Sequence, residues 1–202
     1  MDEKQMWQTI DSERALTADL LAGLTDVEWA YPSLCTGWTV REVAAHLSLA
    51  HRIGVGGALR EFVKARGSFN RMVDQTARAE AHRPTGELVA ELRGAVGVHR
   101  LAPGQSLKNA MMDVMVHTQD MALPLGIERH MPIEAAVASA DDLWRIGFPF
   151  HARRRLAGHR LVATDTDWSA GEGTEVSGPI EALLMLLAGR TATIPRLTGI
   201  GS

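Results

Sequence analysis

Apolar residues recur at helical spacing along most of the chain up to residue 146. In residues 4–24 the apolar side chains gather on one side of a helical wheel, whereas Asp11, Glu13 and Asp19 lie elsewhere on it. The same spacing predicts further helices over residues 39–53, 58–65, 69–81, 85–97, 109–122 and 133–146. The chain is therefore predicted to be mainly α-helical.

Local signals mark the beginning of the helix after Thr39 and a weak point near its middle. Thr39 and Glu42 have the spacing of a capping box, in which each side chain satisfies a backbone amide of the other residue. Gly54, Gly56 and Gly57 follow, and they predict a kink, a close helix contact or room for a ligand.

The helical spacing of apolar residues ends near residue 150. Residues 160–168 have the β-branched, alternating character of a strand, residues 171–173 form a turn, and residues 174–177 are expected to be a return strand. Pro179 then opens a helix that Gly189 closes. We therefore expect an antiparallel helical bundle over residues 1–150 and a small α+β appendage over residues 151–202.

The predicted helix over residues 109–122 carries an unusual polar stripe. Asp113, His117 and Asp120 fall within about 60° of each other on a helical wheel, because spacings of three and four place side chains on one face. Apolar residues flank the stripe on both sides, which is the pattern of a buried helix. Since an unpaired buried charge costs several kcal/mol, these groups must be paired, neutralised or bound to a metal.

His46, on the inner face of the helix after Thr39, is a candidate partner for this stripe. Helical bundles bind metals through side chains of facing helices, and a set of His46, Asp113 and His117 would leave coordination positions open, as in catalytic sites. Zinc is the first expectation, with iron, nickel and manganese as alternatives. Asp120 would then orient one of the ligands by hydrogen bonding.

Two interpretations without a metal stay open for the same residues. A single inward-facing histidine such as His46 is often a core residue that bonds a backbone carbonyl. The histidines and aspartates can also form an internal hydrogen-bonded network.

Composition limits the classes of function. The net charge of −3 and the 46% of hydrophobic residues are ordinary for a soluble protein, so nothing predicts binding to nucleic acid or to a membrane. No secretory signal is visible at the N-terminus. Cys35 is the single cysteine, which excludes an internal disulfide and favours the cytoplasm.

A local basic cluster follows the helical part. Arg153, Arg154 and Arg155 are adjacent, which is typical of a solvated turn. The alternative is that they bind an anionic cofactor or substrate group.

Two motifs resemble those of a known family. Residues 35–47, Cys-Thr-Gly-Trp-Thr-Val-Arg-Glu-Val-Ala-Ala-His-Leu, resemble the first signature of the mycothiol-dependent maleylpyruvate isomerase family, part of the DinB-like superfamily. Residues 113–120, Asp-Val-Met-Val-His-Thr-Gln-Asp, resemble its second signature, usually Glu-x-x-x-His-x-x-Asp. Segments between Leu161 and Arg190 are also similar to C-terminal parts of that family.

This resemblance implies a DinB-like four-helix bundle with a divalent metal held by His46, Asp113 and His117. It also implies that a low-molecular-weight thiol, mycothiol or a related compound, is activated at the metal, because a divalent cation stabilises the nucleophilic thiolate at neutral pH. The expected partners are therefore this thiol and a small electrophilic substrate, and a homodimer is one option for the assembly.

The function that follows is an isomerase or a thiol S-transferase. In an isomerase, the thiolate adds to a carbon-carbon double bond, the bond rotates and the thiol leaves again, whereas in a transferase the thiol is retained. The alternative, from another class, is a non-catalytic DinB-like module that binds metal or acts in a stress response.

One residue of the two motifs departs from the family pattern, and a second one has no role implied by it. Asp113 stands where Glu is usual and is one methylene shorter, so the geometry or the affinity of the metal site is expected to differ. Cys35 belongs to the first motif but is not an implied ligand, and we expect it to be packed rather than catalytic.

Overall fold

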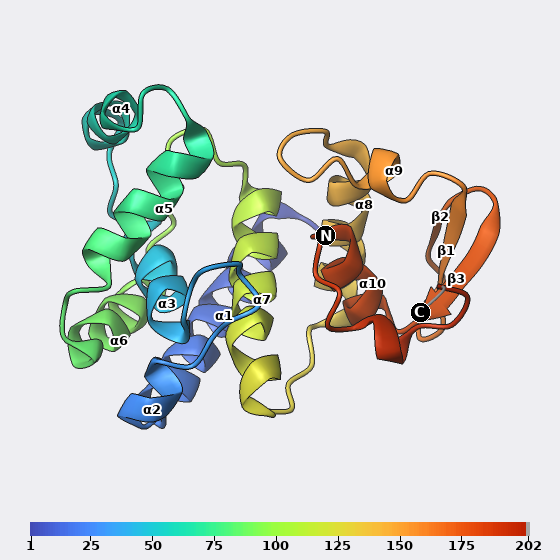
Figure 1. Cartoon of the computed structure of the whole chain (residues 1–202), viewed down its shortest axis with the longest axis horizontal. Coiled ribbons are helices and arrows are strands. Elements are labelled where there is room, and N and C mark those ends of the chain that lie inside the picture. The colour runs from blue at the N-terminus through green and yellow to red at the C-terminus, as the bar shows by residue number, and fades with distance from the viewer. Residues whose placement is uncertain (201–202) are drawn as a thin grey trace.

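The computed structural model describes residues 1–200, and its N-terminal part is helical (Figure 1). Each helix that the apolar spacing predicts has a counterpart, so the mainly α fold is confirmed. The helices of this part are α1 (Glu3–Ala22), α2 (Asp26–Trp29), α3 (Val40–Leu49), α4 (Val55–Lys64), α5 (Phe69–Glu80), α6 (Thr85–Gly94), α7 (Leu107–Ala122), the short 3-10 helix η1 (Leu123–Leu125) and α8 (Ile133–Arg145).

The remaining residues form the expected small α+β unit. Its elements are α9 (Ala152–Arg155), β1 (His159–Ala163), β2 (Ser169–Gly171), β3 (Thr174–Gly178), α10 (Ile180–Leu187) and the 3-10 helix η2 (Ile194–Arg196). Figure 1 shows its sheet at the opposite end of the molecule from α4 and α6.

The sheet has the strand order β2-β1-β3, and its pairing differs from the expected hairpin. The strand that returns along β1 is β2, with Leu161 opposite Ala170, whereas β3 pairs with β1 in parallel. Between them, Gly173 has a φ of +116°, and a Cβ there would lie 2.1 Å from the carbonyl oxygen of Gly158. Glycine therefore lets the chain cross closely over the end of β1 to reach its other edge.

Helices α1, α3, α6 and α7 form the bundle that contains the candidate site. Helix α1 packs against α6 and α7, and α3 packs against the same two helices. The core between them is apolar, and its members include Ala18, Leu21, Val43, Leu47, Leu88, Leu92 and Met121. This packing fixes α3 beside α7, which is the arrangement that the motifs on these two helices require.

The capping box at Thr39 sets the beginning of α3. The amide of Thr39 donates a hydrogen bond of 2.8 Å to Glu42 Oε2, as the sequence predicts. Helix α3 ends at Leu49, earlier than expected, because the amides of Arg52 and Ile53 turn back to the carbonyl of Leu49. The glycines thus begin a separate helix, α4, instead of kinking a continuous one.

A second core joins the bundle to the C-terminal unit. Helix α8 packs against both α7 and α10, and α10 also contacts the strands β1 and β3. The apolar side chains of this core come from both sides of residue 150, among them Met111, Met115, Leu143, Leu161, Leu183 and Leu184. The boundary at residue 150 stays a prediction.

None of the helices in the described part of the chain combines the length and the apolar character that crossing a bilayer requires.

We expect Leu88→Ala to lower the free energy of unfolding by about 2–5 kcal/mol, because the fully buried side chain would leave a cavity in the bundle core. Chemical denaturation measures this change. The matched control is Leu16→Ala on α1, whose side chain is 52% exposed and should cost little. Equal losses in the two variants would contradict the packing described for α6.

Candidate metal centre

Three side chains of the two motifs meet between α3 and α7. His46 points from α3 so that its Nε2 lies 3.6 Å from Oδ2 of Asp113 on α7. His117, one turn after Asp113, places its Nε2 3.4 Å from Oδ1 of the same carboxylate. All donor atoms of this set lie within 4.8 Å of one another, so the structure brings together the residues that the sequence selects.

The spacing of these atoms fits a bound divalent cation. A metal with ligands at about 2.0–2.2 Å in tetrahedral geometry has neighbouring donor atoms roughly 3.3–3.6 Å apart. The two histidine nitrogens lie 3.6 Å from Oδ2 and 3.4 Å from Oδ1 of Asp113, so each has one carboxylate oxygen at such a distance. Imidazole nitrogen and carboxylate oxygen are also the ligand types that zinc, iron, nickel and manganese accept in proteins.

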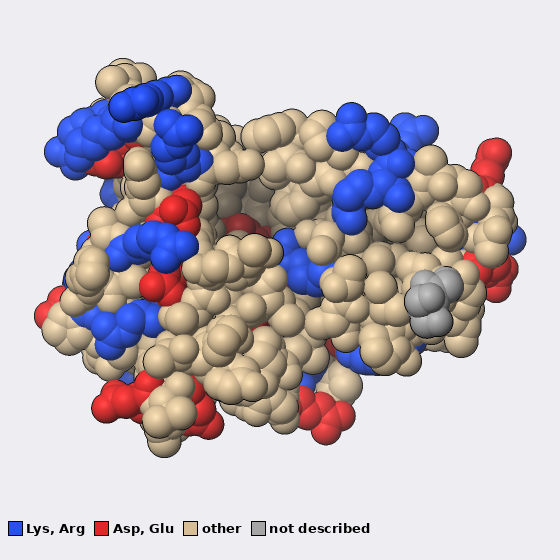
Figure 2. Space-filling model, viewed as in Figure 1, with Lys and Arg blue, Asp and Glu red and all other residues tan. Residues whose placement is uncertain are grey.

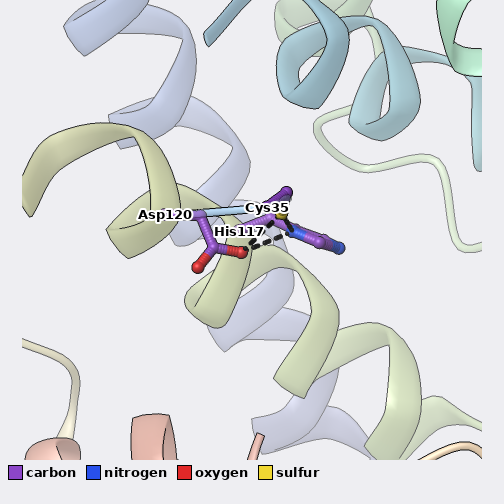
Figure 3. Close-up of side chains that lie close together, drawn as sticks. All are labelled: Cys35, His117 and Asp120. Atoms are coloured by element: carbon purple, nitrogen blue, oxygen red, sulfur yellow. Dashed lines mark hydrogen bonds and ion pairs between the residues drawn. The ribbon is translucent and has the colours of Figure 1, made fainter. Parts of the chain in front are cut away.

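Asp120 lies next to His117 and determines which ring nitrogen of His117 is free. Its Oδ2 is 2.8 Å from Nδ1 of His117 (Figure 3). When Nδ1 carries the proton of this hydrogen bond, Nε2 presents a lone pair toward Asp113. A lone pair and a carboxylate that face each other repel unless a proton or a cation lies between them. This arrangement therefore calls for a proton or a cation between His117 and Asp113, with Asp120 positioned to orient the ring.

Arg190 is a residue of this cluster that reasoning from the sequence missed. Its Nε donates a hydrogen bond of 2.9 Å to Oδ1 of Asp120, and its Nη2 one of 2.6 Å to Oδ2. The side chain of Asp120 is fully buried, and that of Arg190 is 15% exposed. The motif similarity extends to Arg190, but no local pattern indicates that its partner lies 70 residues earlier.

The neighbours of Asp120 and Asp113 determine the protonation state of these two carboxyl groups. Burial by itself would raise the pKa of Asp120, but hydrogen bonds from His117 and Arg190 outweigh burial and hold the pKa below its usual range. Burial also acts to raise the pKa of Asp113, and the neighbouring His46 and His117 bring it below its usual value. Both carboxylates are therefore ionised at neutral pH.

Cys35 lies closer to the centre than expected. Its Sγ is 3.1 Å from Oδ2 of Asp120 and 3.5 Å from Nδ1 of His117 (Figure 3). Burial, and then the charge of Asp120, raise the pKa of this thiol well above its usual value. The thiol is thus protonated at neutral pH and acts as a hydrogen-bond donor to the carboxylate.

Cys35, His117 and Asp120 form a second group with the spacing of metal ligands. Both carboxylate oxygens of Asp120 already accept hydrogen bonds from the guanidinium of Arg190. The positive charge of this guanidinium would repel a metal cation bound at the same carboxylate. Asp113, in contrast, has only the imidazoles of His46 and His117 within ion-pair distance among residues 1–200. The set of His46, Asp113 and His117 is therefore the better candidate.

The site is accessible from the surface. The side chains of His46 and Asp113 are each 21% exposed, and that of His117 is 15% exposed. Figure 2 shows a hollow between the α4–α5 side of the molecule and the α8–α9 side, with acidic atoms visible inside it. Trp38 packs beside His46 with ring centroids 5.7 Å apart, and its Nε1 donates a hydrogen bond of 2.8 Å to Asp74 of α5. The candidate ligands are therefore partly exposed to solvent.

The arginines of the basic cluster lie on the short helix α9. Arg155 uses its guanidinium to bind backbone carbonyls, including that of Leu187 at 2.7 Å. Arg153 lies over the ring of Trp144 at 6.0 Å, and Arg154 is exposed. Binding of an anionic group by this cluster stays a prediction.

We expect Arg190→Gln to lower the free energy of unfolding by about 3 kcal/mol, because it leaves the buried carboxylate of Asp120 without its cation. Chemical denaturation measures the loss, with the exposed Arg71→Gln as the control. Adding Asp120→Asn to Arg190→Gln should cost less than the sum of the two single changes. Additive losses would show that the two side chains do not interact.

Comparisons with known proteins agree with the motifs. Residues 10–102 match the family model of the mycothiol maleylpyruvate isomerase N-terminal domain. No curated protein matches the sequence significantly. Among solved structures, the chain is similar to the crystal structure of the mycothiol-dependent maleylpyruvate isomerase, with a TM-score of 0.67 and 14% identity over 100% of this chain and 95% of that one.

A crystal structure of a histidine-to-alanine mutant of that isomerase is also similar, with a TM-score of 0.65, the same 14% identity and the same coverage of both chains. At this identity the structural likeness establishes a common fold. The resemblance is therefore confirmed: residues 10–102 match the model of the mycothiol maleylpyruvate isomerase N-terminal domain, and the whole chain has the fold of the mycothiol-dependent maleylpyruvate isomerase.

Proposed function

We propose that this protein is a metal-dependent enzyme that uses a low-molecular-weight thiol such as mycothiol as its nucleophile. The observation that carries the proposal is the metal-ligand spacing of His46, Asp113 and His117 at an accessible position. The reaction is an isomerisation or a thiol transfer on a small electrophilic substrate. The fold shared with the mycothiol-dependent maleylpyruvate isomerase supports isomerisation as the first choice.

The metal would be held by His46, Asp113 and His117, and zinc is the ion that fits these ligands best. A divalent cation bound there supplies stabilisation of the thiolate form of the cosubstrate at neutral pH. Asp120, itself held by Arg190, orients His117 and keeps the free Nε2 directed at the centre. Asp113 places a full negative charge between the two histidines.

The chain supplies no thiolate of its own, which supports an external thiol. Cys35 is the single cysteine. Its thiol is protonated at neutral pH, because burial and the charge of Asp120 raise its pKa. A nucleophilic sulfur at this site would therefore have to come from a cosubstrate.

The metal site is tested by the metal content of purified variants. We expect about one divalent ion per chain in the wild type, and strongly reduced content in His46→Ala and His117→Ala, because each loses a ligand. Elemental analysis by mass spectrometry measures the content. The matched control is His82→Ala, which removes an exposed histidine between α5 and α6. Equal metal content in all four proteins would refute the site.

Activity is tested with mycothiol and cis-alkene substrates, and maleylpyruvate is the first to try because the isomerase of the same fold is named for it. We expect turnover that requires mycothiol and is lost in His117→Ala. In an isomerisation the thiol concentration stays constant, whereas in a transfer it falls as product forms. A protein that binds metal but converts no electrophile would instead be a non-catalytic module.

The cytoplasmic location and the homodimer stay predictions, and the two experiments above do not test them.

A further inference from the structure

The indole of Trp38 lies against the candidate metal centre and has no role in the proposed function. Its ring centroid is 5.7 Å from that of His46, and the two ring planes are tilted by 48°. The ring of His117 meets that of His46 edge-on, with centroids 5.0 Å apart. His46 therefore has two aromatic neighbours, one from the loop before α3 and one from α7.

His46 lacks the kind of hydrogen bond that orients His117. Nδ1 of His117 lies 2.8 Å from a carboxylate oxygen of Asp120, whereas Nδ1 of His46 has no hydrogen-bond partner within residues 1–200. Histidines that bind metals usually donate this second N–H to a neighbouring group, which fixes the direction of the ring. The direction of the His46 ring therefore depends on packing, and Trp38 packs against it.

Helix α5 holds the indole in place. Nε1 of Trp38 donates a hydrogen bond of 2.8 Å to Oδ1 of Asp74. Nε of Arg78, one turn later, donates one of 2.9 Å to the same oxygen, and its Nη2 donates one of 2.8 Å to the carbonyl of Gly37. Asp74 and Arg78 thus bind both the side chain of Trp38 and the backbone of the residue before it.

The backbone of Trp38 belongs to a loop that is fixed to α7. The amide of Trp38 donates a hydrogen bond of 2.9 Å to the carbonyl of Cys35, and its carbonyl accepts one of 3.0 Å from the amide of Ser33. The amide of Leu34 in turn donates a hydrogen bond of 3.0 Å to the carbonyl of Asp120. Trp38 is therefore fixed through its backbone as well as its side chain, and it offers a rigid surface to the ring of His46.

We propose that Trp38, held by Asp74, is a positioning residue that sets the direction of the His46 ring at the metal centre. The inference rests on the proposed function, and it adds that the metal affinity depends on α5, which supplies none of the proposed ligands. Without the hydrogen bond between Trp38 and Asp74, the indole would move and the His46 ring would occupy several directions. Binding a metal would then have to restrict that freedom, so the affinity would fall.

The test is the zinc affinity of purified variants, measured by competition with a chromophoric chelator. We expect Trp38→Phe and Asp74→Ala each to raise the dissociation constant for zinc about tenfold, because each removes the hydrogen bond between the two side chains. Asp74→Asn should keep most of the affinity, since its amide oxygen still accepts from Nε1 of Trp38. The double variant Trp38→Phe/Asp74→Ala should bind zinc no more weakly than either single variant.

The chain offers a matched control in Trp168, which precedes β2. Its Nε1 donates a hydrogen bond of 3.0 Å to Oδ1 of Asp141 on α8, so Trp168→Phe removes the same kind of bond and should leave the zinc affinity unchanged. The variant Asp74→Ala should fold, because the side chains of Asp74 and Arg78 are 44% and 48% exposed and such ion pairs contribute little to stability. Unchanged affinity in Trp38→Phe and Asp74→Ala, or an equal loss in Trp168→Phe, would overturn the proposal.

A measurement on the metal-free protein separates this proposal from the metal site. The ring C–H signals of His46 in NMR spectra depend on the distance and tilt of the neighbouring indole, through its ring current, and their loss in His46→Ala assigns them. We expect Asp74→Ala to shift these signals and Asp74→Asn to leave them near their wild-type positions. Unmoved signals in Asp74→Ala would overturn the proposal even if the wild type binds zinc. A wild type that binds no zinc but shows these shifts would refute the metal proposal and still support the positioning of His46 by Trp38.

Discussion

The candidate centre depends on the buried ion pair between Asp120 and Arg190. An ionised carboxylate in a fully buried position costs several kcal/mol unless a cation and hydrogen bonds compensate it. Arg190 supplies that cation through two hydrogen bonds. Because Asp120 is thereby kept ionised, it accepts hydrogen bonds from His117 and from the thiol of Cys35, and its charge keeps that thiol protonated. The ion pair of Asp120 and Arg190 thus orients the ring of His117 and keeps the thiol of Cys35 protonated.

The same pair connects distant parts of the chain. Asp120 lies on α7 in the bundle, whereas Arg190 follows α10 in the C-terminal unit. Helix α8 packs between α7 and α10 and adds an apolar contact to this polar one. The C-terminal unit therefore contributes to the geometry of a centre whose proposed metal ligands all lie on α3 and α7.

The candidate centre lies between α3 and α7 and is only partly exposed. It presents the acceptor atoms of His46, Asp113 and His117, which suit a cation. The side chains of His46 and Asp113 are each 21% exposed and that of His117 is 15% exposed, so electrostatic interactions among them are stronger than they would be in bulk water.

The sequence by itself determined the helices, the capped beginning of α3 and the common face of Asp113 and His117, because helical spacing and local capping depend on residues a few positions apart. The motif resemblance selected His46 as the partner of these two residues, and the structure places it beside them. Only the tertiary structure decided that Arg190 pairs with Asp120, that Cys35 contacts this carboxylate and that β3 runs parallel to β1. Such contacts join residues far apart along the chain, and they exist only once the packing of α7, α8 and α10 brings those residues together.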